Sequence, residues 1–126
     1  MQSYKPTGRR MATKLAVFGI TVAFSGAVFA HVFPKKQEPG AGATVSSPAK
    51  VRILFDGPLE PSFTTLTVTD ASGKQVNVDK ANVDPQQPAV VSVALPPLVA
   101  GHYTVHWAAV ASDGHRTHGD YSFDVK

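Results

Sequence analysis

The sequence predicts an all-β domain, and three observations lead to this prediction. After residue 44 the chain consists of short runs in which apolar and polar residues alternate, and turn residues interrupt these runs. Such alternation is typical of half-buried β-strands. No stretch after residue 31 has the apolar spacing of an amphipathic helix. Hydrophobic residues make up 43% of the 126-residue chain, which is enough for one folded core.

The expected strands follow one another as short segments. Residues 51–55 alternate in polarity and end at an Asp-Gly-Pro turn. Residues 63–69 are rich in threonine and β-branched residues, and a turn connects them to residues 74–78 in an expected hairpin. Further strands are expected over residues 90–95, 103–107 and 121–125. Six or seven such strands predict an immunoglobulin-like Greek-key sandwich or barrel with Trp107 and Phe123 in its core.

The first 30 residues have the pattern of a secretory signal peptide. Residues 1–14 include four basic and no acidic residues, and residues 15–30 carry no charge. The uncharged run is shorter than the roughly 20 apolar residues of a spanning helix, and it ends at Ala30 in a small-residue cleavage pattern. We expect cleavage after Ala30, which divides the chain into a signal peptide over residues 1–30 and a domain over residues 31–126. An uncleaved leader that anchors the domain in a membrane is the alternative.

The distribution of charge excludes one class of function. The formal net charge is +3, but the chain from residue 31 onward has eight Lys and Arg and nine Asp and Glu. A basic surface that binds nucleic acid is therefore not expected. The chain has no cysteine, so disulfides do not hold this exported domain together. It also lacks the nucleophile elbow, the P-loop and the dinucleotide-binding motif.

Two features of the sequence suggest metal chemistry. Cleavage after Ala30 makes His31 the first residue, and its free amine and imidazole can then chelate one metal ion. Nitrogen ligands in a planar arrangement favour Cu(II). Asp113 and His115 lie two residues apart in a loop expected over residues 112–119, so their side chains can approach one ion together. Each feature also has a simpler interpretation, because a peptidase leaves some residue at every terminus and Asp-Gly is a common turn.

The segment from residue 31 to residue 126 resembles the CopC family of periplasmic copper-binding, copper-resistance proteins. The resemblance is carried by PGAGA at residues 39–43, KVRILFDGPLEPSF at residues 50–63 and LPPLVAGHYTVHWAAVASDGHRTHGDYSF at residues 95–123. The D-x-H metal motif of the family falls on Asp113 and His115, and its terminal histidine falls on His31. The resemblance therefore implies one Cu(II) per chain, bound by the amine and Nδ1 of His31, by Asp113 and by His115.

The resemblance also implies a role and a location. It indicates a non-enzymatic, monomeric periplasmic protein that serves copper sequestration, resistance or delivery. Its partner would be an inner-membrane copper transporter or another periplasmic copper protein, and it would contact the membrane only if the leader is uncleaved.

Two departures from the family pattern limit which copper ligands this chain can offer. Some members bind Cu(I) through methionines, whereas the two methionines of this chain, Met1 and Met11, lie in the leader. A dedicated Cu(I) site is therefore not expected, since thioether sulfur is the ligand that suits the reduced ion. Certain members also place a glutamate after the first long strand, where this chain has Gly57. Asp56 and Glu60 are the nearest alternatives to that glutamate.

The sequence gives less reason to expect the remaining histidines to bind a metal. His118 lies three residues after His115 and is either a further ligand, a base beside the site or an exposed loop residue. His102 and His106 alternate with the apolar residues of their strand, so we expect both to face solvent.

Two other classes of function remain open from the residues. Histidine-brace copper monooxygenases also begin at a histidine and use a sandwich fold, but residues 31–126 leave no room for the insertions that form a flat substrate surface. A close carboxylate would also occupy coordination space that oxygen activation needs. The other class is a metal-free adhesion module, which copper would not affect.

Overall fold

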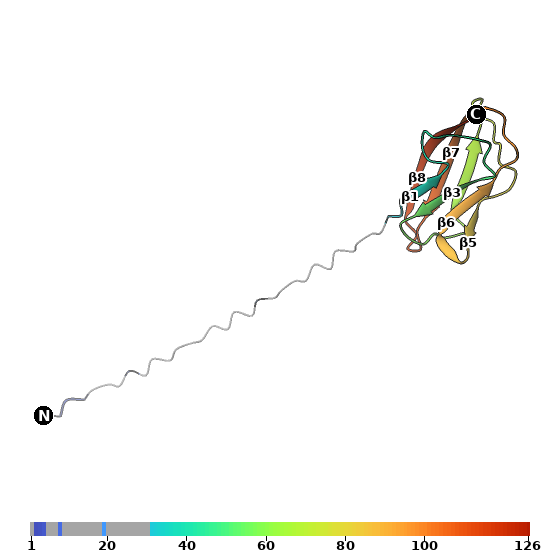
Figure 1. Cartoon of the computed structure of the whole chain (residues 1–126). Helices are drawn as coiled ribbons and strands as arrows, with labels where there is room; N and C mark the ends of the chain where they lie inside the picture. The colour runs from blue at the N-terminus through green and yellow to red at the C-terminus, as the bar shows by residue number, and fades with distance from the viewer. Residues whose placement is uncertain (1, 5–7, 9–18, 20–30) are drawn as a thin grey trace.

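The computed structural model describes residues 2–4, 8, 19 and 31–126, so the predicted signal peptide and its cleavage site lie almost entirely outside the described residues. Residues 31–126 form a sandwich of two four-stranded sheets (Figure 1). Sheet A has the order β1 (Pro34–Glu38), β3 (Lys50–Phe55), β6 (Gln87–Ala94), β5 (Asn82–Asp84). Sheet B has the order β2 (Thr44–Val45), β8 (Arg116–Val125), β7 (Gly101–Val110), β4 (Thr65–Thr69). The predicted all-β sandwich is confirmed, with eight strands in the described part of the chain instead of six or seven.

Alternation places one face of each strand in a common core between the sheets. In β3, the side chains of Val51, Ile53 and Phe55 are at most 1% exposed. Trp107 and Phe123, the two residues predicted for the core, are 9% and 0% exposed. Full burial of one such side chain stabilises the fold by about 1.5–3 kcal/mol, so this core is the main source of stability in a chain without disulfides.

The expected hairpin over residues 63–69 and 74–78 is wrong in its second strand. Residues 74–78 form no strand and make only one isolated bridge, to Thr69. They are attached by both main-chain and side-chain hydrogen bonds. The N–H of Val76 donates to the carbonyl of Val68 at 2.8 Å, and the buried Asn77 accepts a hydrogen bond from the N–H of Val68 at 2.9 Å. The next strand along the chain is β5, which joins the other sheet.

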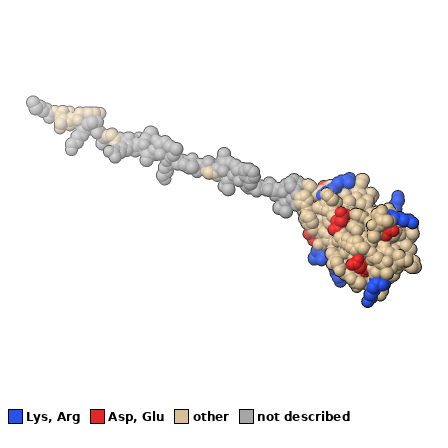
Figure 2. Space-filling model, turned by 90° about the horizontal axis from the view of Figure 1, so that it is seen from above, with Lys and Arg blue, Asp and Glu red and all other residues tan. Residues whose placement is uncertain are grey.

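Charged side chains are dispersed over the domain. Figure 2 shows Lys and Arg interspersed with Asp and Glu on the face in view. Lys36 and Glu38 form one such opposite pair, with 2.9 Å between Nζ and Oε1. Among the described residues, no helix is long and apolar enough to cross a membrane.

β7 and β8 approach closely at one glycine. Trp107 lies directly opposite Gly119 in the antiparallel pairing of these strands. A Cβ atom at position 119 would lie 2.7 Å from Cζ2 of the indole. The indole cannot retreat, because Phe55 packs edge-on against it with 5.3 Å between ring centroids. Glycine is therefore required here by the close approach of the indole.

We expect Gly119→Ala to lower the free energy of unfolding by about 1–3 kcal/mol, the usual effect of overpacking a core. Gly101→Ala is the matched control, because Gly101 also lies in the β7–β8 pair and a Cβ there meets no atom nearer than 3.9 Å. Urea unfolding followed by tryptophan fluorescence measures both variants. Equal stability of the two would contradict the packing of Trp107 on Gly119.

Candidate metal centre

The Asp113-Gly114-His115 motif forms the turn between β7 and β8. The N–H of Ala111 donates to the carbonyl of His115, and the N–H of Gly114 donates to the carbonyl of Ala111, each at 2.9 Å. Gly114 has a φ of 90°, in the left-handed region that favours glycine. The loop expected over residues 112–119 is too long, because its second half already belongs to β8.

The side chains of Asp113 and His115 lie against each other in this turn. Oδ1 of Asp113 accepts the N–H of His115 at 3.0 Å, and Oδ2 lies 3.1 Å from Nδ1 of the imidazole. The hydrogen bond from the His115 N–H is the main cause that lowers the pKa of Asp113 below its usual value. Both side chains are partly exposed, at 35% for His115 and 41% for Asp113.

His31 lies beside the turn, although it is far away in the sequence. The ring centroids of His31 and His115 are 5.5 Å apart, with the planes at 74°. His31 and Asp113 line the same surface pocket of about 240 Å³. β8 ends one residue before the C-terminus, so the turn that precedes β8 lies at the opposite end of that strand.

The three predicted ligands lie close together, since His31 shares a pocket with Asp113 and its ring lies beside that of His115, but they do not form a complete ligand set in the full-length chain. Within the described residues, no group of three or more His, Cys, Asp or Glu side chains is arranged to hold a metal. The nitrogen of His31 is a peptide amide here, because Ala30 precedes it. The amine that the sequence predicts as a ligand exists only after cleavage.

Residues 32 and 33 connect His31 to the body of the sandwich. Val32 is buried, and its carbonyl accepts a hydrogen bond from Oγ1 of Thr117 at 2.7 Å. The N–H of Phe33 donates to Oδ1 of Asp56 at 2.9 Å. Sequence reasoning missed Thr117, although its place two residues after His115 puts it on the same side of the strand.

The sequence and the fold of this chain match those of known proteins. A family model described as the CopC domain matches residues 34–126. This chain belongs to the CopC family. Copper resistance protein C of Xanthomonas campestris pv. juglandis is 33% identical over 124 residues, which cover 94% of this chain and 97% of that protein. The resemblance on which the sequence analysis relied is therefore confirmed.

Two further relatives show the range of the family. Copper transport protein CutJ of Bacillus subtilis (strain 168) is 32% identical over 99 residues, which are 77% of this chain but 18% of CutJ. The chain thus corresponds to a small part of that protein. The crystal structure of CopC from Methylosinus trichosporium OB3b matches with a TM-score of 0.72 and 33% identity, covering 76% of this chain and 94% of that chain.

Two other histidines of this CopC domain lie on the outer face of sheet B, as expected. Nδ1 of His102 donates to Oδ1 of Asp124 at 2.7 Å, and Nδ1 of His106 donates to Oδ1 of Asp120 at 2.7 Å. The second ring nitrogen of His106 lies 3.0 Å from the hydroxyl of Thr69. Both nitrogens of His106 are thus engaged within the sheet, which leaves neither for a metal.

His118 lies in β8 and not in a loop. It is exposed and directly opposite Ala108 of β7. Successive side chains of a strand point to opposite faces, so His118 and Thr117 are on opposite faces of β8. The hydroxyl of Thr117 donates to the carbonyl of Val32, the residue after His31. This CopC domain therefore directs His118 away from the turn that carries Asp113 and His115.

The two acidic residues considered as substitutes for the family glutamate differ in position. Asp56 lines the same pocket as His31, but one of its oxygens already accepts the N–H of Phe33. Glu60 is not among the residues that line this pocket, and its main-chain N–H donates to the carbonyl of Val110 at 2.7 Å. Only Asp56 is near the candidate site.

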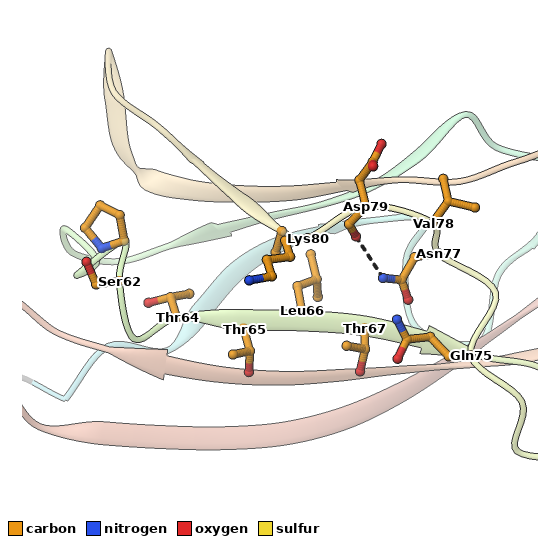
Figure 3. Close-up of a pocket in the computed structure, with 12 residues that line it drawn as sticks. Ser62, Thr64, Thr65, Leu66, Thr67, Gln75, Asn77, Val78, Asp79 and Lys80 are labelled. Atoms are coloured by element: carbon orange, nitrogen blue, oxygen red, sulfur yellow. Dashed lines mark hydrogen bonds between the residues drawn. The ribbon is translucent and has the colours of Figure 1, made fainter.

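A wider pocket of about 400 Å³ lies between β4 and residues 75–81 (Figure 3). Hydroxyl and amide side chains account for six of its twelve lining residues, and none of the five histidines is among them. Asn77 donates to the carbonyl of Asp79 at 3.0 Å while its oxygen accepts the N–H of Val68. Asn77 therefore fastens a connecting segment to the edge of β4, and this pocket has no metal-ligating cluster among its described residues.

The lowered pKa of Asp113 predicts how the turn responds to acid. A depressed carboxyl pKa contributes stability that is present above the ordinary Asp pKa and is lost as the pH falls through the lowered value. Because the main-chain N–H of His115 is the largest cause and remains in the variant, we expect His115→Ala to leave the pKa of Asp113 below its ordinary value. NMR titration of the Asp113 carboxyl carbon in both proteins measures this. Recovery of the ordinary pKa in the variant would assign the effect to the imidazole instead.

Proposed function

We propose that this protein binds one Cu(II) ion per chain in the periplasm and sequesters or delivers it. The observation that carries the proposal is the proximity of His31 to both residues of the turn. His31 lines one pocket together with Asp113, and its ring centroid lies 5.5 Å from that of His115. Membership of the CopC family supports the proposal, since relatives are named copper resistance and copper transport proteins.

The proposed ligands are the amine and Nδ1 of His31, the carboxylate of Asp113 and the imidazole of His115. The amine arises when residues 1–30 are removed, and it lies on the same residue as Nδ1, so the two close a chelate ring. The lowered pKa of Asp113 means that no proton has to leave this ligand at neutral pH. The carboxylate also offsets part of the charge of the bound ion.

The donor set selects the oxidised ion. Imidazole and amine nitrogens with one carboxylate suit Cu(II), whereas Cu(I) prefers sulfur. The only sulfur atoms of the chain are those of Met1 and Met11, and cleavage removes both. We therefore propose tight binding of Cu(II) and weak binding of Cu(I).

The position of the pocket favours exchange of copper with another protein. Asp113 and His115 are on a turn at the end of the sandwich, and both side chains remain partly exposed. An inner-membrane copper transporter or another periplasmic copper protein could take the ion there by ligand exchange. A carrier needs this access, and we propose no catalytic step.

Substitution of the ligands tests the site. We expect His115→Ala and Asp113→Ala to weaken Cu(II) binding by more than the roughly 10–100-fold that loss of a supporting residue costs. His106→Ala is the matched control, because both nitrogens of that ring are engaged in sheet B. Competition titration against a Cu(II) chelator measures all three variants of the processed protein. If His106→Ala is as harmful as His115→Ala, the site has been misplaced.

The terminal amine has its own test. A protein that starts at Ala30 keeps every side chain of the site but presents an amide at His31. We expect this extension to weaken Cu(II) binding at neutral pH and to change the Cu(II) electron paramagnetic resonance (EPR) spectrum, because an amide gives up its proton far less readily than an ammonium. Intact mass of the exported protein checks that the natural chain begins at His31. Native affinity and a native spectrum in the extended protein would exclude the amine as a ligand.

A further inference from the structure

The two residues that follow His31 are bound to both sheets at once. Phe33 exchanges two hydrogen bonds with Asp56, one from its N–H to Oδ1 at 2.9 Å and one to its carbonyl from the Asp56 N–H at 3.0 Å. Asp56 directly follows β3 of sheet A. The carbonyl of Val32 accepts the Thr117 hydroxyl of β8, in sheet B, at 2.7 Å.

An aspartate at position 56 extends the pairing of β1 with β3 by one residue. The regular register ends where Pro34 is opposite Phe55. Beyond it the chain turns away at the Gly-Pro sequence of residues 57–58, and the side chain of Asp56 accepts the Phe33 N–H in place of a main-chain carbonyl. An apolar side chain at position 56 would leave this N–H without its acceptor.

Val32 completes the attachment through packing. Its side chain is 3% exposed and belongs to the main core cluster. A Cβ atom at position 57 would lie 3.2 Å from Cγ1 of Val32, so the glycine there lets the valine pack closely. Three independent contacts thus fix the chain one and two residues away from His31, whereas the ends of a chain are usually mobile unless tied down.

We propose that Asp56 and Thr117 are positioning residues that hold His31 over the β7–β8 turn and so preorganise the terminal copper ligands. This inference rests on the proposed function. When the folded domain already fixes the terminus, copper binding does not have to pay the entropy cost of fixing it. The affinity for copper is higher for this reason. In this role the side-chain oxygen of Asp56 accepts the hydrogen bond from the N–H of Phe33, and the negative charge of Asp56 is not needed.

Two pairs of variants in the processed protein separate this role from others. Asp56→Asn retains an acceptor oxygen for the Phe33 N–H, and Asp56→Ala removes it. Thr117→Ser retains the hydroxyl, and Thr117→Val removes it with almost no change of shape. We expect the Ala and Val variants to weaken Cu(II) binding by about 10–100-fold, as loss of a supporting residue does, and to release copper faster. The Asn and Ser variants should keep nearly native affinity and a native EPR spectrum.

A measurement without copper tests the same contacts. We expect the amide hydrogen of Phe33 to exchange with solvent much faster in Asp56→Ala than in Asp56→Asn, as followed by NMR. Amides in the middle of β7 should be unchanged, which shows that the sandwich is intact. If Asp56→Ala does not fold, the Thr117→Val and Thr117→Ser pair decides the question alone.

The outcomes distinguish failure of the inference from failure of the proposed function. If the processed protein does not bind Cu(II) through His31, the proposed function fails, and unchanged Phe33 exchange in Asp56→Ala would overturn the attachment as well. If the processed protein binds Cu(II) as proposed but Asp56→Ala and Thr117→Val bind equally well, the positioning role is overturned. If Asp56→Asn is as harmful as Asp56→Ala, Asp56 acts through its charge or as a ligand, which also overturns it.

Discussion

The pairing of β7 with β8 is the constraint on which the rest of the molecule depends. Ten consecutive residues of each strand are directly opposite each other, from Gly101 and Val125 to Val110 and Arg116. This register decides which side chains enter the core, because a slip of one residue would exchange the two faces of the strand. It also sets Trp107 on Gly119 and closes the hairpin with the turn that carries Asp113 and His115.

The interior strands and the edge strand β4 could be predicted from the sequence, whereas the edge strands β1, β2 and β5 could not. The segment expected over residues 51–55 is β3, because half of its side chains are buried and its pattern shows this. β1 has the sequence PKKQE, in which no apolar alternation exists, and it forms a strand because β3 offers it hydrogen-bond partners. Residues 74–78 carry a strand-like pattern, yet they form only an isolated bridge to β4, and hydrogen bonds from the main chain of Val76 and the side chain of Asn77 to Val68 attach them.

The candidate site also has one part that the sequence could predict, because it is local, and one part that it could not, because it depends on distant segments. The Asp113-x-His115 spacing is local, and the sequence predicted that these two side chains could approach one ion together; in the structure they lie against each other. The neighbourhood of His31 and His115 depends on contacts between distant segments, through Asp56 and Thr117, which no spacing in the sequence reveals. The family resemblance named His31, but only the structure describes what holds it near the turn.

The geometry of a sheet explains why the end of the sandwich suits a metal better than its outer face. Side chains on one face of a strand pair stand side by side, so a histidine opposite an aspartate bonds to it, as His102 does to Asp124. Such neighbours point in parallel and do not converge on one point. At the end of the sandwich, a turn and an incoming chain meet from different directions, and their side chains can surround a single ion. The same residue types therefore stabilise the sheet on its face and, at its end, offer converging ligands.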